Sequence, residues 1–102
     1  MERDGCGLDT VLDVIAGKWK APILWELRER PLRFGQLRRR VAGITEKVLV
    51  QQLRAMEERG LITREEFDEV PPRVQYALTP LGVSLYETLV PVCEWGERSI
   101  PD

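Results

Sequence analysis

Apolar residues recur at helical spacing in five segments of the chain, and they alternate with polar residues in one further stretch. The helical sets are Leu8, Val11, Leu12 and Ile15; Ile23, Leu24 and Leu27; Phe34, Leu37 and Val41; Leu49, Leu53 and Met56; and Leu81, Leu85, Leu89 and Val92. Steps of three and four residues place each set on one face of a helix. The pattern therefore predicts five amphipathic helices.

Turn-forming residues separate these helices. The first helix should end near Gly17, and the second should begin around Pro22 and end at Arg30 and Pro31. Gly43 breaks the third helix, and Thr45 is a good N-cap for the fourth. The fourth helix should stop at Gly60, which suits a left-handed C-cap. The third and fourth helices, joined by a short link containing glycine, match a helix-turn-helix.

A β-hairpin is predicted after Gly60. Residues 61–67 are β-capable, and Val74, Tyr76 and Leu78 alternate with polar or small residues. The connection 68–72 is rich in proline and too long for a tight turn, so it should project as a wing. The fold expected is mainly α with a small β-hairpin, a winged helix-turn-helix in a single domain spanning 1–102.

The final helix should begin at Thr79 and Pro80 and run to about Glu97, kinked at Pro91. Its apolar stripe is wider than one core contact requires, because it also includes Tyr86, Val90, Cys93 and Trp95. A second buried face is therefore implied. The extra N- and C-terminal helices are expected to serve dimerisation, and Cys93 is expected to be buried by packing.

Charge is segregated along the chain although the net charge is only −2. Residues 18–54 carry ten Lys or Arg and three Glu, whereas the remaining residues are strongly acidic. A basic middle between acidic ends suggests a face built for phosphate, although a charged stretch is often only a solvated surface.

The predicted fourth helix carries candidate base-reading residues opposite its apolar stripe. Lys47, Gln51 and Arg54 share that outer face, and Thr45 precedes it. Lysine and arginine suit guanine, and glutamine suits adenine, in a major groove wide enough for a helix. Ordinary solvated side chains are the alternative interpretation, which the glycine turn, the wing and the local charge oppose.

Several arginines are candidates for phosphate or wing contacts to DNA. They are Arg33, Arg38, Arg39 and Arg40 around the third helix, and Arg73 at the base of the wing. The triplet spreads over about 200° of helix, so only one or two of its members should reach phosphate. Acidic residues make the wing a weaker contact than the helix, and Trp19 and Trp25 are expected to be core or interface anchors.

The sequence argues against an enzyme and against a metal or cofactor site. It contains no histidine, its two cysteines lie far apart, and it has no Gly-rich phosphate loop. The N-terminus does not resemble a secretory signal, and no apolar run is long enough to span a bilayer. A cytoplasmic location is expected.

Five stretches make a family resemblance specific: DVIAGKWK at 13–20, RFGQLR at 33–38, GITEKVL at 43–49, EVPPRVQY at 69–76 and LTPLG at 78–82. In this order they resemble the HxlR-type winged helix-turn-helix regulators. The resemblance implies a homodimer held by the first and last helices, with the fourth helix in the major groove. Some relatives sense oxidants or electrophiles through a cysteine before the first helix, where Cys6 stands, although Asp4 and Asp9 oppose a lowered thiol pKa.

The function expected is sequence-specific regulation of transcription, as a repressor, by a homodimer on pseudo-palindromic double-stranded DNA. A response to oxidants or electrophiles through Cys6 is one variant, and an inert thiol at that position is the other. A winged-helix module that binds a protein partner without reading DNA is the alternative, because a fold does not fix function.

Overall fold

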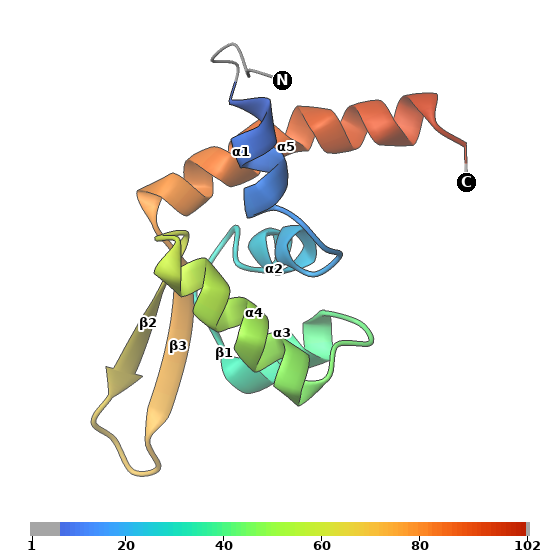
Figure 1. Cartoon of the computed structure of the whole chain (residues 1–102). Helices are drawn as coiled ribbons and strands as arrows, with labels where there is room; N and C mark the ends of the chain where they lie inside the picture. Colours follow the sequence, from blue (N-terminus) through green and yellow to red (C-terminus); the bar gives the residue numbers. More distant parts are fainter. Residues whose placement is uncertain (1–6, 102) are drawn as a thin grey trace.

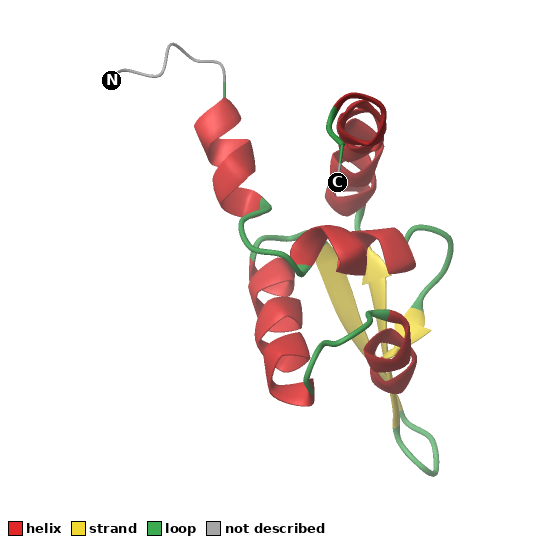
Figure 2. Ribbon diagram, turned by 90° about the vertical axis from the view of Figure 1, so that its right-hand side faces the viewer, coloured by secondary structure: helices red, strands yellow, loops and turns green. Residues whose placement is uncertain are grey.

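A computed structural model describes residues 7–101 of the chain, and this part contains five helices and three short strands. The elements are, in order, α1 (Leu8–Val14), α2 (Lys20–Glu26), β1 (Leu32–Arg33), α3 (Phe34–Arg40), α4 (Glu46–Glu58), β2 (Ile62–Phe67), β3 (Arg73–Leu78) and α5 (Pro80–Ser99). Helices α2, α3 and α4 form a body beside the sheet, and the β2–β3 hairpin projects from it (Figures 1 and 2). The winged helix-turn-helix expected from the sequence is thus confirmed.

The core lies between the helical body and one face of the sheet. Its fully buried side chains come from the predicted apolar stripes of α2, α3 and α4 and from the strands; they are Ile23, Leu24, Leu32, Leu37, Leu49, Leu53, Met56 and Ile62. Burial of a large aliphatic side chain contributes about 1.5–3 kcal/mol, so this cluster supplies most of the driving force for folding. The helical periodicity therefore identified the core of α2 to α4 correctly.

Local signals at both ends of α4 are confirmed. The Thr45 Oγ1 accepts a hydrogen bond from the Val48 N–H at 3.1 Å, which satisfies one of the free donors of the first turn. Gly60 follows the helix with φ +77°, a left-handed conformation that other residues rarely adopt. The sequence placed the second helix less accurately, because α2 ends at Glu26 rather than at Arg30 and Pro31.

The sheet has a strand that the sequence pattern did not indicate. Its order is β1-β3-β2, with both pairings antiparallel, and Leu32 and Arg33 pair with Tyr76 and Gln75 of β3. Two residues are too few to show alternation, so β1 is defined by its partner strand and not by its own pattern. The hairpin β2–β3 was predicted, and residues 68–72 form its connecting loop.

Helix α5 is locked onto the start of the hairpin. The Thr79 Oγ1 accepts from the Gly82 N–H at 3.0 Å and donates to the Gly60 carbonyl oxygen at 2.6 Å. Gly82 lies so close to β2 that a Cβ atom there would collide with the Leu61 carbonyl oxygen. This contact explains why a glycine follows the Thr-Pro cap at the point where α5 crosses the sheet.

Two helices leave large apolar surfaces uncovered by the chain. No residue of α1 is buried, and Leu8 and Leu12 are 55% and 53% exposed. In α5, Val92 and Trp95 are 59% and 53% exposed, and Cys93 is also exposed. The expectation that Cys93 is buried was therefore wrong for the single chain, because the C-terminal half of α5 extends past the body (Figure 1).

Candidate nucleic-acid interface

Helix α4 presents a polar flank on the side away from its buried stripe. Lys47, Gln51 and Arg54 are all exposed, and steps of four and three residues keep them on one side of the helix. Lys47 and Arg54 form no ion pair with any residue of the described part of the chain, so both cations remain available to a ligand. Thr45 is exposed at the helix start, with its hydroxyl occupied by the cap.

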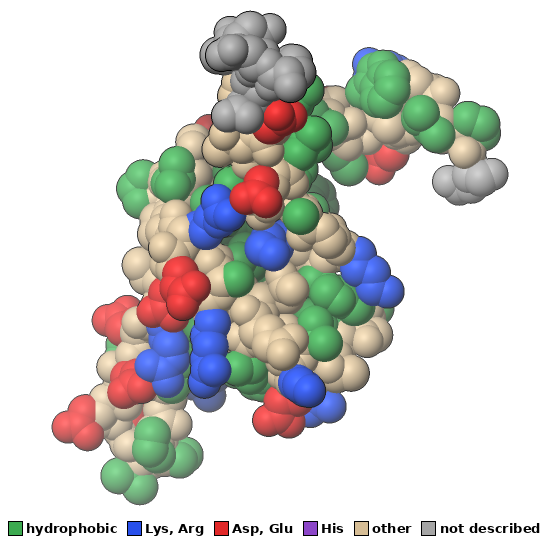
Figure 3. Space-filling view, viewed as in Figure 1, with side chains coloured by type: hydrophobic (Ala, Val, Ile, Leu, Met, Phe, Trp, Pro, Cys, Tyr) green, Lys and Arg blue, Asp and Glu red, His purple; other side chains and the backbone are tan. Residues whose placement is uncertain are grey.

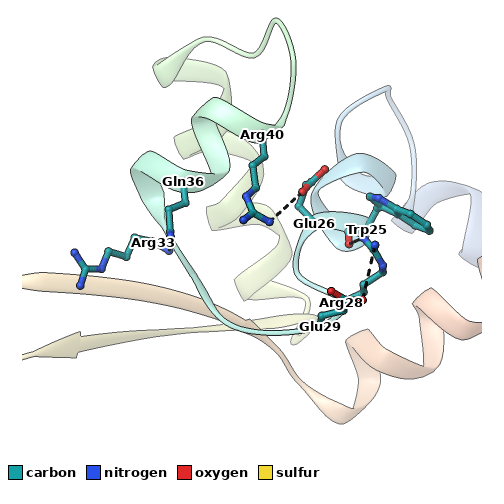
Figure 4. A network of polar contacts seen from close by, with 7 residues as sticks. All are labelled: Trp25, Glu26, Arg28, Glu29, Arg33, Gln36 and Arg40. Carbon is teal, nitrogen blue, oxygen red and sulfur yellow. Dashed lines mark hydrogen bonds and ion pairs between the residues drawn. The ribbon is translucent and has the colours of Figure 1, made fainter.

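The four arginines around α3 differ in how firmly the protein holds them. Arg38 approaches Glu46 at 3.5 Å, and Arg40 approaches Glu26 of α2 at 3.8 Å. Within residues 7–101, Arg33 and Arg39 have no such partner. Figure 4 shows Arg40 turned toward Glu26 while Arg33 extends away from the body. Arg33 and Arg39 are thus the freer candidates for phosphate contact, and Arg40 connects α3 with α2.

Two side-chain hydrogen bonds support the helices of the candidate interface. The Lys20 Nζ donates to the Gln52 Oε1 at 2.9 Å, which connects α2 to the partly buried side of α4. The Gln36 Oε1 accepts from the Arg33 N–H at 2.8 Å and fixes the first turn of α3. The first contact ties α4 to α2, and the second is local to the start of α3.

Arg73, expected at the base of the wing, is engaged within the protein. Its guanidinium lies 2.7 Å from the Glu69 carboxylate and stacks 3.9 Å from the centre of the Phe67 ring. Both contacts stabilise the wing loop, and they leave Arg73 less available to DNA than Arg33 or Arg39.

Arg64 on β2 is a candidate contact that the sequence reasoning missed. It pairs across the hairpin with Tyr76, on the sheet face that also carries the buried Ile62. Its guanidinium lies 2.6 Å from the Glu66 carboxylate, and hydrogen bonds to Glu66 and then Tyr76 raise the pKa of Arg64. Strand alternation counted from Ile62 is the signal that would have placed Arg64 on this face.

Basic side chains lie at several places on the face drawn in Figure 3, and some of them stand side by side. In Figure 3, Lys and Arg side chains lie between the hairpin and the helical body, and acidic side chains flank them toward the wing. On this face the hairpin is mainly acidic, whereas basic and acidic side chains are interspersed on the helical body.

Comparison with known proteins identifies the family of this chain. Residues 14–102 match the profile of the family described as HxlR-like helix-turn-helix. The chain belongs to this family. It is 42% identical to YkvN, an uncharacterised HTH-type transcriptional regulator of Bacillus subtilis, over 94% of this chain and 81% of that protein. Regulation of transcription through DNA binding is accordingly the function class of this HxlR-like protein.

Solved structures agree with this assignment. A MarR-family transcriptional regulator from Enterococcus faecalis V583 superposes with a TM-score of 0.86 at 44% identity, covering 96% of this chain and 89% of that one. The redox regulator HypR in its reduced form superposes with a TM-score of 0.83 at 39% identity, covering 88% and 89%. The HxlR-like chain therefore shares its fold with both proteins over most of its length.

The remaining candidate positions of the HxlR-like protein are Cys6, Trp19 and Trp25. Cys6 lies outside the described residues. Trp19 packs half-buried against the core, whereas Trp25 is half-exposed with the Arg28 guanidinium 3.7 Å from its ring centre. Within residues 7–101, no three His, Cys, Asp or Glu side chains are grouped as metal ligands, and no helix is long and apolar enough to cross a membrane.

Proposed function

We propose that two copies of this chain bind one pseudo-palindromic DNA duplex, with the exposed flank of α4 in successive major grooves, and repress transcription there. The observation that carries the proposal is that α4 combines a buried apolar stripe with an exposed polar flank, on which Lys47 and Arg54 form no ion pair within the described part of the chain. Lys47 and Arg54 would read guanine edges, and Gln51 would read adenine.

The arginines on neighbouring elements are assigned to the phosphate backbone. Arg33 and Arg39 would contact phosphates directly, because no carboxylate within residues 7–101 holds them. Arg38 and Arg40 would contribute less, since each would first have to leave its partner carboxylate. Phosphate contacts set orientation and general affinity, and base contacts set sequence preference.

Homodimerisation is supported by the uncovered faces of α1 and α5. Leu8 and Leu12 of α1 and Val92 and Trp95 of α5 are more exposed than isolated apolar residues of a soluble chain need to be. A symmetric dimer would bury these faces and present two α4 helices separated by about 34 Å, one turn of DNA.

The names of two similar proteins also support the proposal. YkvN is an HTH-type transcriptional regulator, and HypR is a redox regulator. Repression is proposed because a dimer bound to its DNA site would occlude that site. Redox or electrophile sensing through Cys6 stays a prediction.

The proposal is tested by selecting bound duplexes from a random pool and measuring variants by mobility shift. Lys47→Ala and Arg54→Ala should each cost about 1–3 kcal/mol on the selected site and relax base preference at one position. Arg98→Ala is the matched control, because it removes an exposed arginine from α5, and it should leave sequence preference unchanged.

The alternative is a protein-interaction module without sequence-specific DNA binding. It predicts no enrichment of any sequence from the pool, and equal, weak binding of all duplexes by the parent protein and both α4 variants. That result would overturn the assignment of α4 as the reading helix.

A further inference from the structure

We propose that Lys20 is a positioning residue for DNA reading, because its hydrogen bond to Gln52 sets the rotation of α4 about its own axis. The inference rests on the function proposed above for α4. The Lys20 Nζ donates to the Gln52 Oε1 at 2.9 Å, and both side chains are half-buried. Within residues 7–101, Lys20 forms no ion pair, so this amide oxygen is its polar partner. A charged donor makes such a contact stronger than a neutral hydrogen bond.

Gln52 lies at the border between the buried and the exposed sides of α4. Leu53 and Met56 are buried on one side of it, whereas Gln51, the candidate reader of adenine, is exposed on the other. Gln51 and Gln52 are consecutive residues, so they point about 100° apart on one rigid stretch of helix. A contact that holds Gln52 therefore also sets the direction in which Gln51 points.

The buried stripe of α4 sets its rotation less exactly than base reading requires. Burial of apolar surface is non-directional, so it favours a buried stripe over an exposed one more strongly than it selects one angle. A rotation of about 15° moves a side-chain end that lies about 5–6 Å from the helix axis by about 1.5 Å. A binding constellation must be held within about 0.5 Å. A directional hydrogen bond from a neighbouring helix supplies the missing restraint.

Both ends of this contact are attached to the rest of the protein. Trp19 packs against the core directly before Lys20 and so anchors the start of α2. Arg59 lies seven positions after Gln52, close to two turns, and therefore on the same side of α4. Its guanidinium lies 2.8 Å from Asp13 of α1. The exposed Arg59 pair is the weaker of the two contacts, so Lys20 carries the main positioning role.

A double-mutant cycle on the full chain tests the inference. Affinities of Lys20→Met, Gln52→Met and the double variant are measured by mobility shift on the site selected by the parent protein and on a scrambled duplex of equal length. We expect each single variant to lower the ratio of the two affinities by roughly three- to tenfold, the net contribution of one hydrogen bond. The double variant should lose no more than either single one, because both remove the same contact. A variant that folds poorly lowers both affinities equally and leaves the ratio unchanged.

Lys18→Met is the matched control. It removes the same charge two positions earlier, from an exposed lysine that lies over the Trp19 ring at 4.8 Å and not on α4. The control should leave the ratio unchanged. The salt dependence should also stay unchanged in Lys20→Met, because the Lys20 ammonium is assigned to Gln52 and not to phosphate.

Two results would overturn the positioning role alone. One is a parent protein that selects a sequence while Lys20→Met and Gln52→Met keep the parent ratio or lose it additively. The other is an equal loss on both duplexes with a salt slope reduced by about one unit, because Lys20 would then contact a phosphate. A parent protein that selects no sequence would instead overturn the proposed function, and the positioning role with it.

Discussion

At the scale of single residues, Gly82 shows how one position joins two elements. The Thr79 hydroxyl caps α5 and also reaches the Gly60 carbonyl oxygen, so the helix start is pressed against the start of the hairpin. A side chain at Gly82 has no space, because its Cβ would meet the Leu61 carbonyl oxygen, a backbone atom. Backbone atoms cannot rotate away as a flexible side chain can.

Gly82→Ala should therefore destabilise the protein by about 2–3 kcal/mol, because either α5 or the hairpin must shift. Urea denaturation followed by circular dichroism measures the change. Gly96→Ala is the matched control, since Gly96 is also in α5 and an added Cβ meets no atom within 4 Å. The control should be neutral or stabilising by up to about 1 kcal/mol. Equal losses in both variants would show that the Gly82 contact is unimportant.

The basic residues show how far single-residue reasoning from the sequence extends. Helical spacing relative to the buried stripe placed Lys47, Gln51 and Arg54 on the exposed flank of α4, and the structure has them there. The same reasoning gave Arg73 a place in the wing but not its contacts with Glu69 and Phe67. Ion pairing depends on loop conformation, which no periodic pattern encodes.

At the scale of elements, the wing combines attraction and repulsion for DNA. Arg64 on β2 faces the same side of the sheet as Tyr76, and Glu66 holds its guanidinium at 2.6 Å. Glu65 lies on the other face of the strand and pairs with no cation in residues 7–101. Like Arg38 and Arg40, Arg64 must leave its carboxylate partner before it can contact a DNA phosphate; we expect this exchange to occur, because an exposed ion pair is only marginally stable.

Arg64→Ala should weaken binding to all duplexes similarly and reduce the slope of log affinity against log salt by about one unit. Glu66→Gln should strengthen binding, because it removes both a repelling charge and the internal partner of Arg64. The control Glu65→Gln removes a charge without releasing an arginine, so its gain should be smaller. If the two glutamine variants behave identically across a salt titration, Arg64 does not contact phosphate.

Helices with several apolar residues at regular spacing could be predicted from the sequence. Short elements, and elements that depend on contacts with other parts of the chain, could not. The core faces of α2, α3 and α4 follow directly from their spacing, and caps at Thr45 and Thr79 fixed two helix starts. Strand β1 has two residues and forms only because β3 offers a free edge. The early end of α2 at Glu26 likewise reflects packing, since no strong local signal stops the helix there.

At the scale of the whole molecule, the exposed apolar surfaces of α1 and α5 indicate that a single chain leaves part of its apolar surface unburied. The Arg59 guanidinium lies 2.8 Å from Asp13 and joins the end of α1 to the end of α4. No residue of α1 is fully buried, and Val14 at its end is the α1 side chain that packs against the core of its own chain. An exposed ion pair contributes about 0–1 kcal/mol, too little to hold a two-turn helix in place. A second chain covering Leu8 and Leu12 would supply the missing burial.

The double variant Leu12→Glu with Trp95→Glu should therefore dissociate the dimer. Placing a charge at two buried contacts costs about 3 kcal/mol or more, which raises the dimer dissociation constant at least roughly 100-fold in analytical ultracentrifugation. Val70→Glu is the matched control, because Val70 is apolar and 100% exposed at the wing; it should leave the dimer intact. Since each monomer carries one α4, the double variant should also lose affinity for the full selected site while retaining weak binding to half of it. A monomeric parent protein, or a double variant as dimeric as Val70→Glu, would refute the assignment of α1 and α5 as the interface.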